Sequence, residues 1–173
     1  MATPISLLFL FLPIFFSSPV SSALLHKHSS APGITILSYR AQNDSSIKAT
    51  IRSIANCRSK TVDLSKFLEK LRKSDGKKYE IMALEDCHSL LMDSKEEMGD
   101  SLKELKQYKK DKNMVHVENV QTWLSAALTN IDTCSDGVEE GASEGLKKAI
   151  GSRISDVANL MSGSLELVNQ LRG

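Results

Sequence analysis

Residues 120–134 read VQTWLSAALTNIDTC, and the spacing of the apolar side chains in this stretch decides the fold. These side chains recur every third or fourth residue, at Val120, Leu124, Ala127, Ile131 and Cys134. Such spacing places side chains on one face of an α-helix. The stretch therefore predicts an amphipathic helix, from about Val117 to Cys134, that must bury this face against other elements. We expect Asp136-Gly137 to end it.

Three further segments show the same helical spacing, beginning near residues 46, 78 and 143. Their apolar positions are Ile47, Ile51, Ile54, Thr61, Leu64, Leu68 and Leu71, then Leu84, Cys87, Leu91, Met98, Leu102 and Leu105, then Leu146, Ile150, Ile154, Val157, Met161, Leu165, Val168 and Leu171. The second of them is expected to end near Tyr108, before a loop at residues 109–113. No alternating run of useful length indicates a β-strand.

Four amphipathic helices joined by short connections predict an all-α fold, most economically an up-down-up-down four-helix bundle. The composition agrees, because aromatic residues make up only 5% of the chain and proline is absent after Pro32. The net charge of +1 argues against a strong electrostatic attraction to nucleic acid or to a membrane surface.

The chain has three cysteines, and helix geometry predicts which two form a disulfide. Cys87 and Cys134 lie about 20 residues before and after the predicted loop, so each is about 30 Å from the turn. Antiparallel neighbours bring them to the same level, and both fall on apolar faces, which suits a disulfide. In the chain-entropy model this bond contributes about 4 kcal/mol. Cys57 then remains a free thiol that packs as a small hydrophobe. The alternative is an intermolecular disulfide through Cys57 and a covalent dimer.

The N-terminal region predicts a secreted protein. Residues 1–23 carry no charged side chain, and the small residues before Ala23 suit a signal peptidase. Their apolar run is shorter than the roughly 20 residues of a membrane span, so we expect a cleaved signal peptide and no membrane association afterwards. Residues 24–45 show no periodicity and are expected to form a poorly ordered leader, with the bundle domain over residues 46–173. Asn43 begins an N-glycosylation acceptor tripeptide and is the predicted glycan site.

Motifs of catalysis are missing from the sequence. It contains no nucleotide-binding glycine loop, His-Glu-x-x-His or Gly-x-Ser-x-Gly. The four histidines are scattered, and the carboxylates lie on the predicted outer faces of helices. We therefore expect no catalytic residues, no metal site and no cofactor, and a protein that is not an enzyme.

Four segments resemble the plant invertase and pectin methylesterase inhibitor family: ALEDC at 83–87, VQTWLSAALT at 120–129, DTCSDG at 132–137 and LMSGSL at 160–165. The similarity covers roughly residues 46–171. It implies a four-helix bundle whose second and third helices are tied by a disulfide, in agreement with the pairing argued above from geometry.

The resemblance also bears on the target. The Trp123 segment is most similar to the pectin methylesterase branch and to the inhibitory pro-regions that precede some pectin methylesterases. Invertase inhibitors tend to carry Pro-Lys-Phe before the third helix, where this chain reads KNMVH at 112–116. The family's N-terminal helical hairpin, closed by its own disulfide, is not expected here, because residues 24–45 contain no cysteine.

The resemblance implies an inhibitor of pectin methylesterase that lies across the pectin-binding cleft of the enzyme and acts in the cell wall, in the apoplast. The expected partner contacts are exposed polar residues on the second and third helices: Asp93, Glu97, Asp100, Gln121, Thr122, Ser125 and Thr129. Two alternatives remain within the family, an invertase inhibitor and a truncated, non-inhibitory relic of a pro-region. A lipid-associating helical protein is disfavoured, because the apolar stripes are narrow and the charges are mixed.

Overall fold

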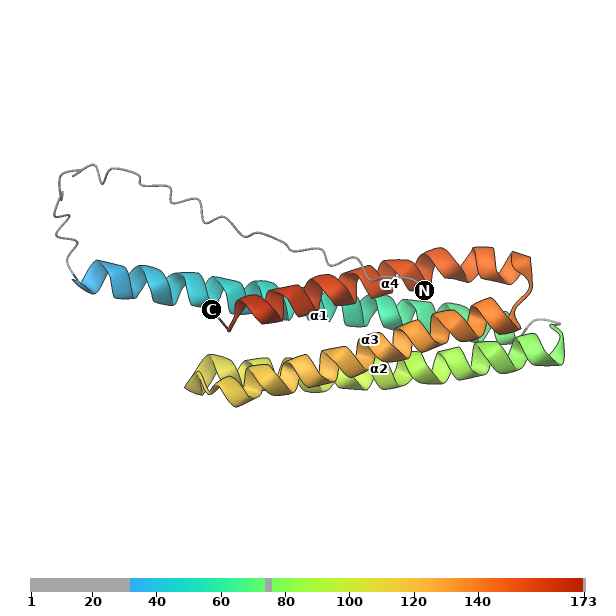
Figure 1. Cartoon of the computed structure of the whole chain (residues 1–173), viewed down its shortest axis with the longest axis horizontal. Coiled ribbons are helices and arrows are strands. Elements are labelled where there is room, and N and C mark those ends of the chain that lie inside the picture. The colour runs from blue at the N-terminus through green and yellow to red at the C-terminus, as the bar shows by residue number, and fades with distance from the viewer. Residues whose placement is uncertain (1–31, 74–75, 173) are drawn as a thin grey trace, which may run out of the picture. The chain divides into compact units, whose positions relative to one another are not determined.

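The computed structural model describes residues 32–73 and 76–172, which form four helices and no strand. They are α1 (Pro32–Arg72), α2 (Lys78–Asp111), α3 (Met114–Gly141) and α4 (Glu144–Gln170). Figure 1 shows that consecutive helices run in opposite directions along a common axis. α1 packs against α2 and α4, and α3 does the same, while no Cα atoms of the diagonal pairs lie within 8 Å of each other. The predicted all-α four-helix bundle is confirmed.

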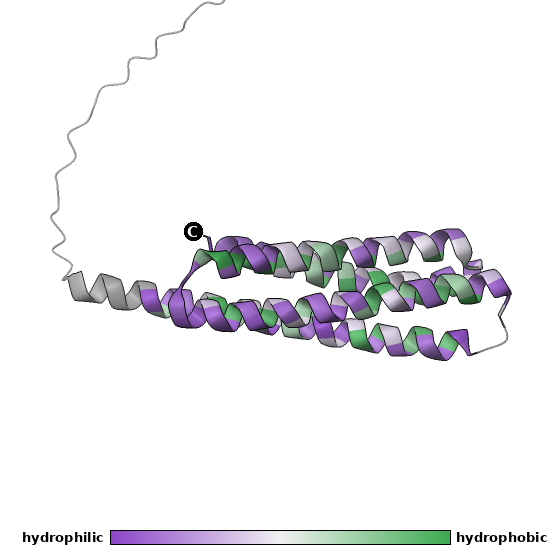
Figure 2. Cartoon of the chain, turned by 90° about the horizontal axis from the view of Figure 1, so that it is seen from below, coloured by the Kyte–Doolittle hydropathy of each residue, from purple (hydrophilic) through white to green (hydrophobic). Residues whose placement is uncertain are grey.

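The core follows a heptad pattern in all four helices. In α2, for example, the buried positions alternate in steps of four and three from Glu80 to Tyr108. This pattern is typical of left-handed bundles whose helices pack knobs into holes. Figure 2 shows hydrophobic residues recurring between hydrophilic ones along the helices.

Small polar residues occupy several core positions, most of which the apolar pattern does not identify. They are Thr50, Thr61, Ser94, Ser101 and Ser164 among the buried residues, of which only Thr61 lay on a predicted stripe. Each of these hydroxyls donates to the backbone carbonyl four residues earlier. The Ser164 hydroxyl also lies 2.8 Å from that of Ser53 on α1. The hydroxyls are thereby satisfied, and burying them costs little.

α1 begins earlier than the sequence indicates. The expectation of a poorly ordered leader is wrong for residues 32–45, which are helical. Proline suits the first turn of a helix, where its missing N–H would have no partner. Once the segment after Ser46 has formed a helix, each added residue gains a hydrogen bond without a new nucleation cost. The predicted signal peptide and residues 24–31 lie outside the described residues.

α2 and α3 are also longer than expected. α2 continues to Asp111, and Lys112 ends it in the left-handed conformation with φ 57°. Asp136-Gly137 does not end α3, because Val138 is a further buried position of the same stripe and the helix runs to Gly141. At the same end of the bundle as Gly141, the Glu80 carboxylate accepts the backbone N–H of Lys77 and that of Ser143. This carboxylate ties the start of α2 to the α3–α4 connection.

No helix within residues 32–73 and 76–172 has both the length and the apolar character needed to cross a bilayer.

Candidate protein-interaction site

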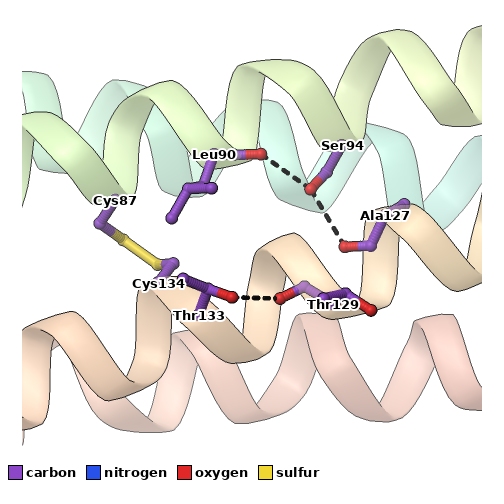
Figure 3. Close-up of a disulfide and its surroundings, with 7 residues drawn as sticks. All are labelled: Cys87, Leu90, Ser94, Ala127, Thr129, Thr133 and Cys134. Carbon is purple, nitrogen blue, oxygen red and sulfur yellow. Dashed lines mark hydrogen bonds between the residues drawn. A yellow bond between two sulfur atoms is a disulfide. The ribbon is translucent and has the colours of Figure 1, made fainter.

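α2 and α3 are joined covalently. Cys87 and Cys134 form a disulfide with their Cα atoms 4.3 Å apart, as predicted (Figure 3). Close to it, a Cβ atom built on Gly141 would lie 2.7 Å from the Cβ of Ala83. Only glycine permits so close an approach of the two helices here.

A buried serine connects the same two helices further along (Figure 3). The Ser94 hydroxyl lies 2.9 Å from the carbonyl oxygen of Leu90 on its own helix and 3.1 Å from that of Ala127 on α3. Ser94 is seven residues, or about 10 Å, from Cys87 along α2. The disulfide and this hydrogen bond therefore hold the register of α2 and α3 at two levels.

The outer side of this helix pair carries an array of exposed and half-buried side chains, which we call the α2–α3 face. The Glu97 carboxylate accepts a hydrogen bond of 3.1 Å from the Asn130 amide across the two helices. Burial raises the pKa of Glu97, the Asn130 hydrogen bond opposes this, and the nearby charge of Asp93 adds to it. Trp123 is 39% exposed although it is the only tryptophan of the chain. A half-exposed tryptophan among polar groups is typical of a protein contact surface.

The loop end of the face holds a histidine between two carboxylates. His116 Nδ1 lies 2.6 Å from a Glu104 oxygen, and Nε2 lies 3.1 Å from an Asp111 oxygen. The hydrogen bond to Glu104, followed by that to Asp111, raises the pKa of His116 against the opposing effect of burial. Both ring nitrogens can donate only when the imidazole is protonated, so this arrangement favours the charged ring.

The face is acidic. α3 contains no lysine or arginine, and its carboxylates are Glu118, Asp132, Asp136, Glu140 and Glu139, the last of which pairs with Lys147 of α4 at 3.9 Å. On α2, Asp93 is exposed and forms no ion pair with the part of the chain that the structure describes, while Asp100 pairs with Lys103 at 2.7 Å. A partner with a basic surface would be attracted to this side of the bundle.

Six of the seven predicted contact residues lie on the outer sides of α2 and α3. Asp93, Glu97 and Asp100 follow each other along α2, and Thr122, Ser125 and Thr129 along α3. The Thr122 and Thr129 hydroxyls donate to the carbonyls of Glu118 and Ser125.

Gln121 is different, because its side chain faces α4. Its amide nitrogen bonds to the side-chain oxygen of Asn169 at 2.5 Å, and its oxygen accepts from Arg172 at 2.9 Å. Gln121 therefore fastens the C-terminal end of the bundle to α3.

Sequence reasoning did not select Trp123, Asn130, Glu104 and His116 as members of the face. A signal for Trp123 was present, because it is a large apolar residue outside the core stripe of its helix. The other three are recognisable only once the register of α2 against α3 is known.

A groove of about 410 Å³ lies beside the disulfide, lined by apolar and small residues that include Tyr79, Met82, Leu90 and Gly137. Tyr79 and Met82 are among the most exposed large hydrophobic side chains of the described residues. The groove extends the α2–α3 face toward the start of α2.

Cys57 and Asn43, predicted as a free thiol and a glycan site, both lie in α1. Cys57 is a free cysteine, fully buried, with its sulfur 3.7 Å from the carbonyl oxygen of Val157. The alternative of a dimer linked through Cys57 receives no support, because this sulfur cannot reach another chain while the bundle is folded.

Asn43 is half-buried, and its side-chain oxygen lies 3.4 Å from the Lys112 ammonium. Its glycosylation stays a prediction.

Within the described residues, no group of three or more His, Cys, Asp or Glu side chains is arranged to hold a metal ion. These residues form a helical bundle with a polar face on α2 and α3.

Comparison with known proteins identifies the family to which this protein belongs. The model of the plant invertase/pectin methylesterase inhibitor family matches residues 25–167, and the chain belongs to this family. It is 37% identical over 138 residues to pectinesterase inhibitor 9 of Arabidopsis thaliana, covering 76% of this chain and 67% of that protein. It is 35% identical over 150 residues to pectinesterase inhibitor 3 of the same plant, covering 83% and 69%.

A solved structure shares the fold. The crystal structure of a pectin methylesterase inhibitor from Arabidopsis thaliana superposes with a TM-score of 0.63 at 16% identity, covering 73% of this chain and 78% of that one. Membership in a family of inhibitors makes this chain a non-enzymatic protein.

Proposed function

We propose that the protein inhibits pectin methylesterase by laying the α2–α3 face across the substrate cleft of the enzyme, so that the pectin chain cannot enter. The observation that carries the proposal is that α2 and α3 are joined at two levels, by the Cys87–Cys134 disulfide and by the Ser94 hydrogen bond. The outer surface of this joined pair is acidic. A face that is rigid before binding loses little conformational entropy on association.

The size and chemistry of the face support this role. α3 has 28 residues, so the face is about 40 Å long, enough for a standard interface of roughly 800 Å² on each partner. Trp123 supplies an aromatic anchor near its middle. Asp93, Glu97, Asp100, Thr122, Ser125 and Thr129 supply polar contacts around it. Gln121 acts indirectly, through its bonds to Asn169 and Arg172.

The site of action follows from the target. Pectin is a cell-wall polymer, so we propose that the chain is secreted to the apoplast after removal of residues 1–23. The family description names two enzymes, and invertase is the second candidate target. The segment at residues 112–116, which lacks Pro-Lys-Phe, favours the methylesterase.

The proposal is tested by titrating a plant pectin methylesterase with the oxidised, secreted protein while a cell-wall invertase is assayed in parallel. We expect near-stoichiometric loss of methylesterase activity and an unaffected invertase. Loss of invertase activity alone would reverse the choice of target. If the folded protein inhibits neither enzyme, it is a non-inhibitory relative of the pro-regions.

A pair of matched variants locates the interface. Neutralising the α2 carboxylates with D93N, E97Q and D100N should weaken inhibition about tenfold or more, because each removes a polar contact or a charge at the face. The same charge change on α4, with E144Q, D156N and E166Q, should leave inhibition unchanged. Equal effects of the two variants would place the enzyme elsewhere on the bundle.

A further inference from the structure

The charges of the bundle are segregated between opposite corners. α1 carries eight lysines and arginines against three carboxylates, Asp44, Asp63 and Glu69. α3, which lies diagonally across the bundle from α1, carries five carboxylates and neither lysine nor arginine. The net charge of +1 therefore conceals a basic helix on one side and an acidic face on the other.

Some of the α1 cations are used within the fold. Arg72 pairs with Glu85 of α2 at 3.5 Å, and the Arg58 guanidinium donates to the Lys95 carbonyl at 3.0 Å. The carboxylates Asp44 and Glu69 are likewise occupied, by Lys112 and Lys73.

Six other cations of α1 are exposed and form no ion pair with the described residues. Four of them, Lys48, Arg52, Lys66 and Lys70, form what we call the α1 basic stripe, and the other two are Arg40 and Lys60. Lys66 lies 18 residues after Lys48, and Lys70 lies 18 after Arg52. At about 3.6 residues per turn this is close to five turns, so the two pairs lie on the same outer side of α1, about 27 Å apart. Asp63 is the one unpaired carboxylate between them.

We propose that the α1 basic stripe binds an acidic polysaccharide with regularly repeated carboxylates, namely the de-esterified pectin that pectin methylesterase produces. The choice of this polymer rests on the proposed function, whereas the presence of an anion-binding stripe rests on α1 alone. Hydrolysis of a methyl ester converts a neutral unit of the polymer into a carboxylate, so the stripe distinguishes product from substrate by charge.

The arrangement suits a polymer better than a small anion. A single exposed ion pair contributes little to binding, so one lysine does not hold a free carboxylate. A chain that spans both pairs gains several contacts for one loss of translational freedom. Single-stranded nucleic acid is disfavoured, because its sites combine cations with stacking aromatic rings. Phe67, the aromatic residue nearest the stripe, packs beneath Arg153 at 4.3 Å.

The two surfaces lie on different helices, so they can be occupied together. Product bound to α1 would retain the inhibitor where de-esterification has already occurred, with the α2–α3 face still available to the enzyme.

The test measures binding of the oxidised, secreted protein to immobilised polygalacturonate at low and moderate salt. The stripe variant carries K48Q, R52Q, K66Q and K70Q, and glutamine keeps the helix propensity high. The matched control carries K78Q, K106Q, K109Q and K110Q on α2, with the same change in net charge. We expect the stripe variant to bind about tenfold more weakly, the control to bind like the wild type, and highly methylesterified pectin to bind poorly.

Three results would overturn the inference: equal binding by the stripe variant, loss of binding in the α2 variant alone, or tighter binding of a single-stranded polynucleotide. Methylesterase inhibition, measured on soluble methylesterified pectin, separates the two proposals. The stripe variant should inhibit as well as the wild type. A protein that binds polygalacturonate but inhibits no methylesterase would disprove the proposed function and leave the basic stripe in place.

Discussion

At the scale of single residues, the thiol of Cys57 shows how a core position suppresses reactivity. Its sulfur is fully buried against α4, and burial raises its pKa to about 12, with the Thr61 hydrogen bond opposing the rise. The thiolate is the reactive form. We therefore expect no reaction of the native protein with a thiol-specific chromophoric disulfide, and one reactive thiol per chain after denaturation without reductant. Rapid labelling of the native protein, or a disulfide-linked dimer on a non-reducing gel, would contradict this.

His116 gives the bundle a dependence of stability on pH. Its pKa is raised in the folded state, first by the hydrogen bond to Glu104 and then by Asp111. A raised pKa means that the folded protein holds the proton more tightly than the unfolded chain. The contribution to stability is therefore complete below the unfolded pKa near 6.5 and is lost as the pH rises through the folded value.

We expect the urea midpoint of the wild type to fall between about pH 6 and pH 8, and the H116Q variant to lose this part of the slope. The matched control is H88Q, which changes a half-buried histidine on α2 instead of the one on α3. This variant should keep the wild-type slope. Identical profiles for the wild type and H116Q would show that the two hydrogen bonds do not form in solution.

At the scale of helices, the periodicity of the apolar residues predicts the number of helices, their core faces and the disulfide. It does not predict their ends. Asp136-Gly137 reads as a helix stop, yet Val138 continues the core stripe, and packing against α2 outweighs the low propensity of glycine. Serines at core positions break the apolar pattern as well, since a sequence does not show that a hydroxyl such as that of Ser94 has a partner on another helix.

The sequence predicts only part of the candidate face, because helical periodicity identifies exposed positions but not the contacts between helices. Exposed positions on α2 and α3 follow from the helical period, which correctly places Asp93 and Thr129 outside the core. The bonds that join helices depend on register, so neither the turn of Gln121 toward Asn169 nor the Glu97–Asn130 pair could be anticipated.

At Gly141, the close packing of α3 against α2 requires a residue without a side chain. A Cβ there would lie 2.7 Å from that of Ala83, whereas one on Gly137, a turn earlier in the same helix, would meet nothing within 4 Å. We expect G137A to stabilise the protein by about 0.5–1 kcal/mol through helix propensity. G141A should destabilise it by about 1–3 kcal/mol, because the two helices must move apart. Chemical denaturation measures both, and a stabilising G141A would show that the α2–α3 spacing is relaxed in solution.

At the scale of the whole molecule, the helices divide the tasks of the bundle. α2 and α3 are held together by covalent and hydrogen bonds and present the acidic face. α1 and α4 close the core on the other side, where the α1 basic stripe is exposed. The acidic residues that we assign to enzyme binding therefore lie on α2 and α3, and the basic residues that we assign to polysaccharide binding lie on α1.

The Cys87–Cys134 bond should supply a large share of the stability of the whole bundle. It joins residues 47 apart in the sequence, and closing such a loop in the unfolded chain is worth about 4 kcal/mol in the chain-entropy model. A domain of this size is typically stable by only about 5–15 kcal/mol.

We expect a reductant, or C87A combined with C134A, to lower the guanidinium midpoint sharply and to weaken methylesterase inhibition at elevated temperature in parallel. The reductant should have no further effect on the double variant, which controls for action at Cys57. If the reduced and oxidised proteins unfold at the same midpoint, packing and the Ser94 bond alone hold α2 to α3, and the rigidity of the face does not depend on the disulfide.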